Sequence, residues 1–151
     1  KIDNVELDKV VSDAIDLFET RQSSVSIQYS PQSYQMVRAN SIRLEQVLVN
    51  LISNALDAIE HKEQPQLSIA TQELSNTIQI LVKDNGLGIP EEDIPYLFDP
   101  FYSSKTTGKG LGLGLSIAYN IIKDFGGSIH VESVEHQGTT FIVTLPKGTG
   151  S

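Results

Sequence analysis

The segment 78–90 constrains the fold more than any other stretch, because an alternating run ends there at a carboxylate followed by glycines. Ile78, Ile80 and Val82 alternate with polar or smaller residues, as in a β-strand with one buried face. The same parity places Asp84 on the buried face. We therefore expect a half-buried strand that delivers a carboxylate to the interior at its end.

A carboxylate in the interior needs a partner, because burying an unpaired charge is costly. Asp84 is therefore paired with a cation, protonated, or directed at a ligand that brings N–H groups, such as the exocyclic amine of adenine. Gly86 and Gly88 allow a tight turn with positive φ and a close approach of the backbone to a flat ring. A plain β-turn at Asp84-Asn85-Gly86 is the alternative, and this segment alone does not decide between the two.

The size and charge of the chain limit its function. Its 151 residues fit one domain. The formal net charge of −8 argues against binding to nucleic acid or to anionic membranes. The sequence has no cysteine, which excludes disulfides and thiolate metal sites and is compatible with the cytoplasm. It contains neither a signal-peptide pattern nor an apolar run near the ~20 residues that span a bilayer.

The two ends of the chain suggest a fragment. Because it begins at Lys1 and not at Met, we expect a piece of a larger protein. We expect one domain over residues 1–147, and we assign 148–151 to a flexible tail or a remnant of cloning. No internal repeat or shift in composition marks a second domain.

Periodicity predicts the elements on either side of the central strand. Apolar residues at helical spacing predict helices over 5–20, 42–61 and from 115 to about 125. Alternation predicts strands at 25–29, 67–70, 129–131 and 141–145. We expect 34–38 to return as the hairpin partner of 25–29. Pro90 is expected to open a short acidic helix at 91–94.

The predicted helix 42–61, capped by Asn40-Ser41, carries a polar stripe opposite a broad apolar face. The stripe contains Arg43, Gln46, Asn50, Asn54 and Asp57. Asparagine is a mediocre helix former, so two of them one turn apart suggest amides kept to bind a metal or a phosphate oxygen. An ordinary solvated face is the alternative.

A glycine-rich segment precedes the next helix. Residues 103–114 hold four glycines and two lysines without periodicity, and we expect a mobile lid there. The run from Gly108 to Gly114 leads into a helix, an arrangement that presents backbone N–H groups to a phosphate. It matches neither the Walker nor the Rossmann pattern. A flexible hinge is the alternative.

Taken together, the order of these motifs resembles the ATP-binding catalytic domain of sensor histidine kinases, within the superfamily of gyrase, Hsp90 and MutL. The residues that carry the resemblance are an N box at 43–59, a first glycine box at 84–90, an F box at 97–101, a second glycine box at 110–115 and a Gly-Thr motif at 138–141. Five motifs in the expected order are far more specific than any one of them. The segments around Asn54 and Gly112 look most similar to nitrogen-regulation and C4-dicarboxylate sensors.

The resemblance implies an α/β fold of the Bergerat type. Its parts are a two-layer sandwich, a mixed five-stranded sheet with helices on one face, and a mobile lid over ATP. It implies that ATP and Mg²⁺ are the cofactors, and that the γ-phosphoryl group goes to a histidine on a separate dimerisation domain. The chain's own His61, His130 and His136 stand in no phospho-acceptor context.

The resemblance also implies roles for individual residues. Asp84 would accept from the adenine amine, Asn54 would ligate Mg²⁺, and Asn50 would steer the γ-phosphate. Further residues expected to contact the nucleotide are Asp57, Gly86, Gly88, Ile89, Phe98, Lys105, Lys109, Gly110, Leu111, Gly112, Leu113, Gly114, Leu115 and Thr140. Among these, Thr140 would reach the adenine side.

Two departures from the family pattern affect the phosphate end. Asp57 stands where many members carry lysine, and the glycine-rich segment has no arginine. A cation near the γ-phosphate must then come from Lys105, Lys109 or Arg43. We expect Lys105 to be catalytic together with Asn50, because it directly follows the F box.

Three rival functions share parts of the pattern. An ATP-hydrolysing clamp of the gyrase, Hsp90 or MutL kind would place a glutamate at the position of Asn50. A serine kinase of the anti-sigma type typically lacks an F box like 98–101. A decayed interaction module would not keep Asp84, Asn54 and the glycines.

The resemblance finally implies partners and a location. The phospho-acceptor histidine domain would be the direct partner and a response regulator an indirect one. The parent protein is expected to be a membrane-bound homodimer that holds this domain in the cytoplasm. The isolated domain is expected to be monomeric.

Overall fold

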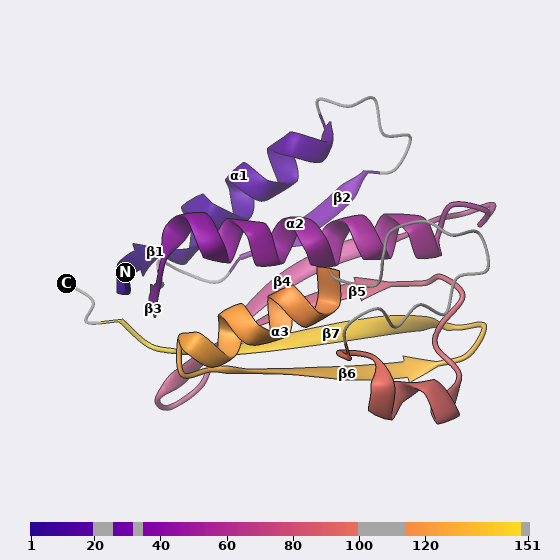
Figure 1. Ribbon diagram of the computed structural model, residues 1–151. Coiled ribbons are helices and arrows are strands. Elements are labelled where there is room, and N and C mark those ends of the chain that lie inside the picture. Colours follow the sequence, from indigo (N-terminus) through magenta and orange to yellow (C-terminus); the bar gives the residue numbers. More distant parts are fainter. Residues whose placement is uncertain (20–25, 32–34, 100–113, 149–151) are drawn as a thin grey trace.

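The structure is a computed structural model and describes residues 1–19, 26–31, 35–99 and 114–148 (Figure 1). Its elements in chain order are β1 (Asp3–Glu6), α1 (Leu7–Glu19), β2 (Ile27–Ser30), β3 (Met36–Ala39), α2 (Ser41–Ala58), β4 (Leu67–Glu73), β5 (Thr77–Asp84), the 3-10 helix η1 (Glu91–Tyr96), α3 (Gly114–Asp124), β6 (Ser128–Val134) and β7 (Gly138–Pro146).

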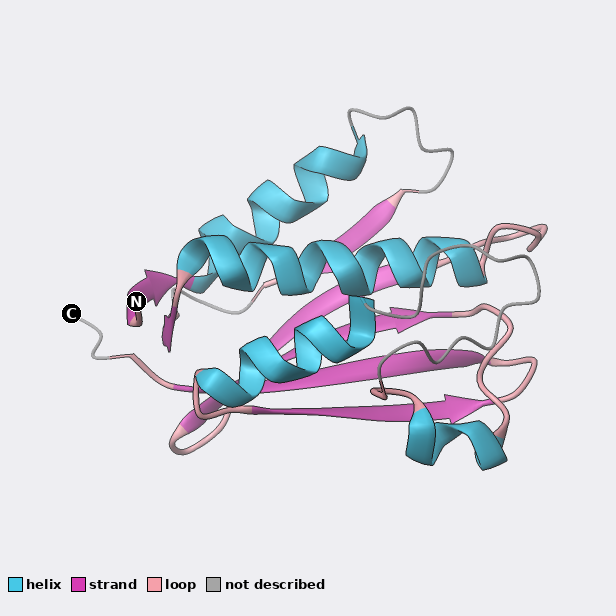
Figure 2. Ribbon diagram, viewed as in Figure 1, coloured by secondary structure: helices cyan, strands magenta, loops and turns pink. Residues whose placement is uncertain are grey.

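The fold has two layers, one of strands and one of helices. The five-stranded sheet has the order β2-β4-β5-β7-β6. Its pairs are antiparallel except for β2 with β4, which run parallel. Helices α1, α2 and α3 lie over one face of this sheet (Figures 1 and 2). This is the mixed-sheet α/β sandwich that the family resemblance implies.

The core lies between the two layers, where apolar helix faces meet alternate residues of the strands. The apolar face of α2 is buried, through Leu44, Val47, Leu48, Leu51, Ile52 and Ala55, and Leu56 is partly buried against the same core. Burial alternates strictly along β5 and β7. Central strands with one covered face produce this pattern, so the predicted parity is confirmed.

The first strands differ from the prediction. Residues 36–39 do not return against β2 but pair antiparallel with β1, with Val37 opposite Val5. Strand β2 pairs with β4 instead, placing Ile27 beside Leu67. The expected hairpin is therefore wrong. Alternation identifies a strand and its buried face, but it does not identify the partner strand.

Two boundaries in the structure also differ from the predicted ones, the start of the first helix and the end of the domain. The first helix begins at Leu7 and not at residue 5, because residues 3–6 form β1. The domain continues through Gly148, whose N–H donates to the carbonyl oxygen of Met36 at 2.8 Å. Gly148 is thus bonded to β3 and does not belong to a free tail. None of the helices in the described ranges is both long and apolar enough to cross a membrane.

Candidate functional site

Asp84 ends β5 with its side chain on the helix-covered face, where the residue is 4% exposed. Its carboxylate accepts a hydrogen bond from the backbone N–H of Gly86 at 2.8 Å and another from the backbone N–H of Thr139. Burial raises the pKa of Asp84, and the two N–H donors oppose that rise. Within the described part of the chain no cation pairs with this carboxylate. It is held in place as an acceptor.

The two glycines after Asp84 let the loop pack tightly against neighbouring backbone. A Cβ at Gly86 would overlap the carbonyl group of Ala58, at the C-terminal end of α2. Gly88 has φ of +73°, and a Cβ there would overlap the carbonyl oxygen of Val134. The predicted positive φ is thus confirmed at Gly88. In both cases, however, the close approach is to the protein's own backbone.

The loop brings α2 and the β6–β7 hairpin to the same place. The N–H of Leu87 donates to the carbonyl oxygen of Ala58 at 3.2 Å, and the carbonyl oxygen of Leu87 accepts from His136 N–H at 2.6 Å. Asn54 lies one helical turn before Ala58. The C-terminal end of α2, where Asn54 lies, and the end of β5 that carries Asp84 are therefore both next to this loop.

The hairpin contributes Thr139, a residue that the sequence reasoning missed. Thr139 pairs directly with Asp84 across β5 and β7, and it is 5% exposed. Thr140 pairs with Lys83, on the sheet face turned away from the helices. The expectation that Thr140 reaches the adenine side is therefore wrong by one residue. The alternation along the strand could have identified Thr139, because it lies two residues before the apolar Phe141 and therefore shares its buried face.

The polar stripe of α2 faces the start of α3. Asn50, Asn54 and Asp57 are all half-buried on this helix. The side-chain amide of Asn50 donates to the carbonyl oxygen of Gly114 at 3.2 Å. This bond joins the middle of α2 to the first residue of α3, and so places Asn50 at the end of the second glycine box.

The donor set suits Mg²⁺ in one specific way. The described residues contain no group of three His, Cys, Asp or Glu side chains that could hold a metal ion. Mg²⁺ typically takes one or two protein oxygens and completes its shell with phosphates and water. A single amide oxygen from Asn54 beside a nucleotide would fit this habit, whereas the residues that the structure describes form no all-protein cage.

The described part of the F box packs inside the protein. The Phe98 ring stacks on Tyr119 of α3 with centroids 5.4 Å apart and meets the edge of Phe141 at 6.3 Å. Leu115 is also partly buried against the core, and Ile89 is buried. These contacts connect the segment after η1 to α3 and β7, which gives Phe98 a packing role whether or not it also touches a ligand.

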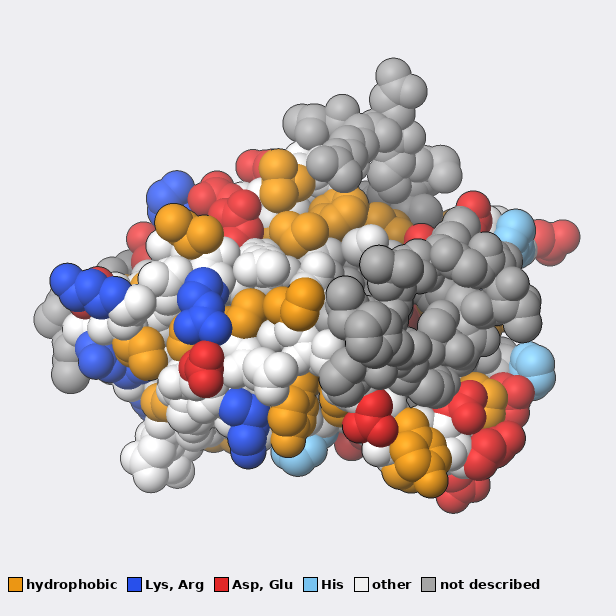
Figure 3. Space-filling model, in the orientation of Figure 1, with side chains coloured by type: hydrophobic (Ala, Val, Ile, Leu, Met, Phe, Trp, Pro, Cys, Tyr) orange, Lys and Arg blue, Asp and Glu red, His pale blue; other side chains and the backbone are white. Residues whose placement is uncertain are grey.

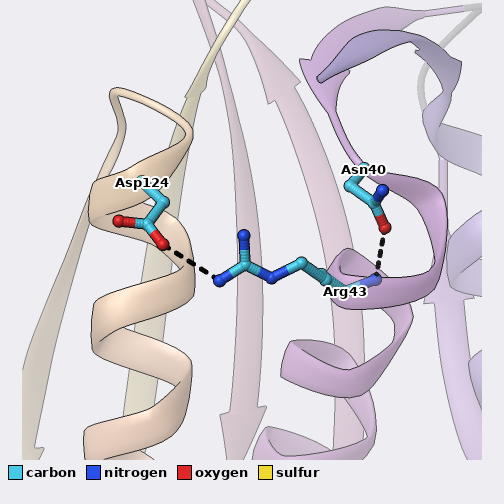
Figure 4. Close-up of polar contacts among 3 residues, drawn as sticks. All are labelled: Asn40, Arg43 and Asp124. Carbon is cyan, nitrogen blue, oxygen red and sulfur yellow. Dashed lines mark hydrogen bonds and ion pairs between the residues drawn. The ribbon is translucent and has the colours of Figure 1, made fainter. Parts of the chain in front are cut away.

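Arg43 lies away from the proposed phosphate end. Its guanidinium forms a 3.0 Å ion pair with Asp124 at the C-terminal end of α3, and Asn40 caps its backbone N–H at 2.9 Å (Figure 4). The same group lies over the Phe125 ring, 5.7 Å from its centroid. Asn50 is two helical turns further along α2. Arg43 is therefore not placed to contact the γ-phosphate, and Lys105 and Lys109 remain as the candidate cations.

The remaining predicted residues belong to the segment 100–113. They are Lys105, Lys109, Gly110, Leu111, Gly112 and Leu113, all of which lie outside the described residues.

Acidic side chains gather over η1 on the face drawn in Figure 3, where Glu91, Glu92 and Asp93 form the first turn. A phosphate chain would be repelled from that side, so its donors must come from elsewhere.

Comparison with known proteins connects this geometry to one family. The model of the family "Histidine kinase-, DNA gyrase B-, and HSP90-like ATPase" matches residues 39–149. That span covers α2, Asp84 and the β6–β7 hairpin, the parts that border the site.

Within this family, the chain is similar to sensor proteins and to the catalytic domain of a histidine kinase. The C4-dicarboxylate transport sensor protein DctB of Rhizobium meliloti is 43% identical over 86% of this chain and 20% of its own length. NtrB of the same organism, a sensory histidine kinase/phosphatase, is 36% identical over 86% of this chain and 37% of its own length. The catalytic domain of histidine kinase ThkA superposes with a TM-score of 0.85 at 32% identity, covering 98% of this chain and 97% of that domain. The chain spans only about a fifth to two fifths of these curated relatives.

Proposed function

This chain belongs to the histidine kinase-, DNA gyrase B- and HSP90-like ATPase family and is a catalytic ATP-binding domain of the sensor histidine kinase kind. From this premise we propose that it binds Mg-ATP and passes the γ-phosphoryl group to a histidine on a separate dimerisation domain. The observation that supports the proposal most is Asp84, a buried carboxylate held by two backbone donors, with no cation partner among the described residues.

Adenine binding follows from the acceptor character of that carboxylate. The exocyclic amine of adenine would donate a hydrogen bond to the carboxylate of Asp84. This bond would use the acceptor capacity that the two backbone donors leave unused. Thr139 stands beside it on the same face and takes the place that we first gave to Thr140. Gly86 and Gly88 keep the floor of the site close to α2 and β6.

The triphosphate would extend from the base toward α2 and the start of α3. Asn54 would hold Mg²⁺ through its amide oxygen, and Asn50 would act on the γ-phosphate from one turn earlier. Bound there, Mg²⁺ would neutralise the charge of the phosphates. Backbone N–H groups of 110–114 would donate hydrogen bonds to the phosphate oxygens. Lys105 would be the catalytic cation, with Lys109 close by.

Such a set is sufficient for phosphoryl transfer, which depends mainly on positioning and on charge stabilisation and needs no covalent intermediate on this domain. Asn50 also argues for a kinase and against a hydrolytic clamp. An amide cannot remove a proton from water, and this one donates to Gly114. The phosphate should therefore be retained until an acceptor histidine is presented.

The names of the relatives and the family resemblance support a proposal about the parent protein and its partners. DctB and NtrB are named as a transport sensor and a histidine kinase/phosphatase. ShkA, which shares this fold at 21% identity with a TM-score of 0.84, was solved full-length in complex with AMPPNP. We infer a dimeric, membrane-bound parent with this domain in the cytoplasm, its phospho-acceptor helix as direct partner, and a response regulator downstream.

A transfer assay tests the proposal. The domain is mixed with Mg-ATP and a purified dimerisation domain that carries a phospho-accepting histidine, and acid-labile phosphohistidine is measured. We expect phosphohistidine from the wild type, a large loss from Asp84→Asn, and no loss from Lys83→Gln, the adjacent change on the opposite sheet face. Rapid ATP hydrolysis without an acceptor, and no phosphohistidine with one, would contradict the proposal.

A further inference from the structure

Three polar residues stand side by side across the sheet at the point where Asp84 ends its strand. Asp84 of β5 pairs with Thr139 of β7, and Thr139 pairs in turn with Ser133 of β6. Directly paired residues carry their side chains on the same face, about 5 Å apart. Asp84 and Thr139 are buried, and Ser133 is half-buried at the edge strand. The proposed function assigns no task to Ser133.

The hydroxyl of Ser133 has three neighbours within hydrogen-bond distance. It accepts from the N–H of Ile89 at 2.8 Å, and it lies 3.0 Å from the carbonyl oxygen of Gly138 and 2.9 Å from Oγ1 of Thr139. A backbone N–H can only donate and a carbonyl can only accept, whereas either hydroxyl of the Ser133–Thr139 contact could be the donor. All three contacts are hydrogen bonds at once only when the single proton of Ser133 is directed at Gly138.

This count determines the proton of Thr139. With its own proton given to Gly138, Ser133 can meet Thr139 only as an acceptor, so the Thr139 hydroxyl donates to Ser133. The lone pairs of Thr139 Oγ1 are then what remains for any neighbour. Beside them stands the carboxylate of Asp84, which also accepts. This end of the site consequently offers two acceptors side by side.

We propose that Ser133 is a positioning residue for base recognition, which fixes Thr139 as an acceptor and so selects a purine with an exocyclic amine over one with a carbonyl. The inference rests on the proposed nucleotide binding and adds a source of base specificity to it. An amine supplies protons to both acceptors, directly or through one water. A carbonyl at the same position would bring a third acceptor with no proton between them.

ADP and IDP are the probes that isolate this effect, because they differ only where adenine carries an amine and hypoxanthine a carbonyl with a protonated ring nitrogen. Their dissociation constants are measured by titration calorimetry in the presence of Mg²⁺. We expect the wild type to prefer ADP. Ser133→Ala frees the Thr139 hydroxyl to rotate and donate, so ADP should bind about three- to tenfold more weakly while IDP is unchanged or improved.

Two further variants separate positioning from folding. Ser133→Thr keeps the hydroxyl and should restore the ADP preference. Ser133→Cys keeps the shape but bonds weakly, so it should reproduce the loss of preference even if the alanine variant folds poorly. With Thr139→Val in the background, Ser133→Ala should no longer change the ratio of the two affinities.

The results that would overturn the inference are distinct. Equal weakening of ADP and IDP by Ser133→Ala would mean that Ser133 only ties the Ile89 loop to the hairpin. An unchanged ADP preference in both Ser133→Ala and Ser133→Cys would remove any role in base selection. Failure of the wild-type domain to bind ADP at all would overturn the proposed function itself, and this inference with it.

Discussion

The side-chain amide of Asn50 donates a hydrogen bond to the main-chain carbonyl oxygen of Gly114 across 64 residues of sequence. The bond joins the polar stripe of α2 to the first residue of α3. The bond is exposed to solvent, so its own contribution to stability is modest, about 0.5–1.5 kcal/mol at most. Its importance is positional, because it sets where α3 begins relative to Asn50.

Asn50→Ala should therefore impair transfer far more than folding. We expect a fall in phosphohistidine formation of at least about tenfold at saturating ATP, since one aligned donor near a developing charge is commonly worth that much. Gln46→Ala is the matched control, one turn earlier on the same stripe and exposed. Single-turnover transfer and urea denaturation measure the two effects. A loss in transfer explained wholly by unfolding would contradict the assignment.

Gly88→Ala should destabilise the domain regardless of nucleotide. Gly88 has φ of +73°, and an added Cβ would overlap the carbonyl oxygen of Val134. Gly126 provides the control, because its φ of +81° is similar but a Cβ there meets only Pro146 Cγ at 3.9 Å. We expect about 1 kcal/mol of loss for Gly126→Ala from conformation alone and a clearly larger loss for Gly88→Ala. Equal losses in thermal or urea unfolding would refute the packing argument.

The buried carboxylate predicts a specific pH dependence. Burial raises the pKa of Asp84 in the folded state, so the folded domain binds this proton more tightly than the unfolded chain. The contribution of Asp84 to stability is then greatest below the ordinary aspartate pKa of about 3.9 and is lost as the pH rises through the raised value. Asp84→Asn cannot titrate.

The measurement is the free energy of unfolding of wild type minus that of Asp84→Asn, followed from acidic to neutral pH. This difference should fall with rising pH across the window and stay flat above it, because the other carboxylates cancel. A difference that rises with pH would mean that the fold stabilises the ionised carboxylate.

The residues around Arg43 predict two stability effects of different origin. Asn40→Ala removes the cap on the Arg43 N–H and should cost about 1 kcal/mol at any ionic strength. Asp124→Asn removes an ion pair whose side chains are 41% and 61% exposed, and should cost less than about 1 kcal/mol. Urea denaturation in low salt and in about 1 M salt separates them, because screening abolishes only the ion pair. A salt-sensitive Asn40→Ala would contradict this division.

The sequence predicted the parts of the fold that depend on local pattern. The buried faces of α2 and of β5 follow from periodicity, and the Asn40 cap follows from residue type. The partner of β3 could not be predicted in this way, because pairing with β1 depends on where α1 turns the chain.

The same division holds for the site. Asp84 could be placed in the interior by counting along one strand. Thr139 and Ser133 required knowing which residues of β7 and β6 stand beside it. The role of Arg43 depended on Asp124, which lies 81 residues away in sequence. Interactions across strands and between helices were therefore what the one-dimensional pattern did not contain.

Titration of Mg-ADP into the wild type and Asp84→Asn, with Lys83→Gln as the control on the opposite face, tests the central claim most directly. A hydrogen bond to a charged group contributes about 1.5–3 kcal/mol, so Asp84→Asn should bind ADP about ten- to a hundredfold more weakly while Lys83→Gln matches the wild type. If a folded Asp84→Asn bound ADP as tightly as the wild type, the base would not rest on this carboxylate.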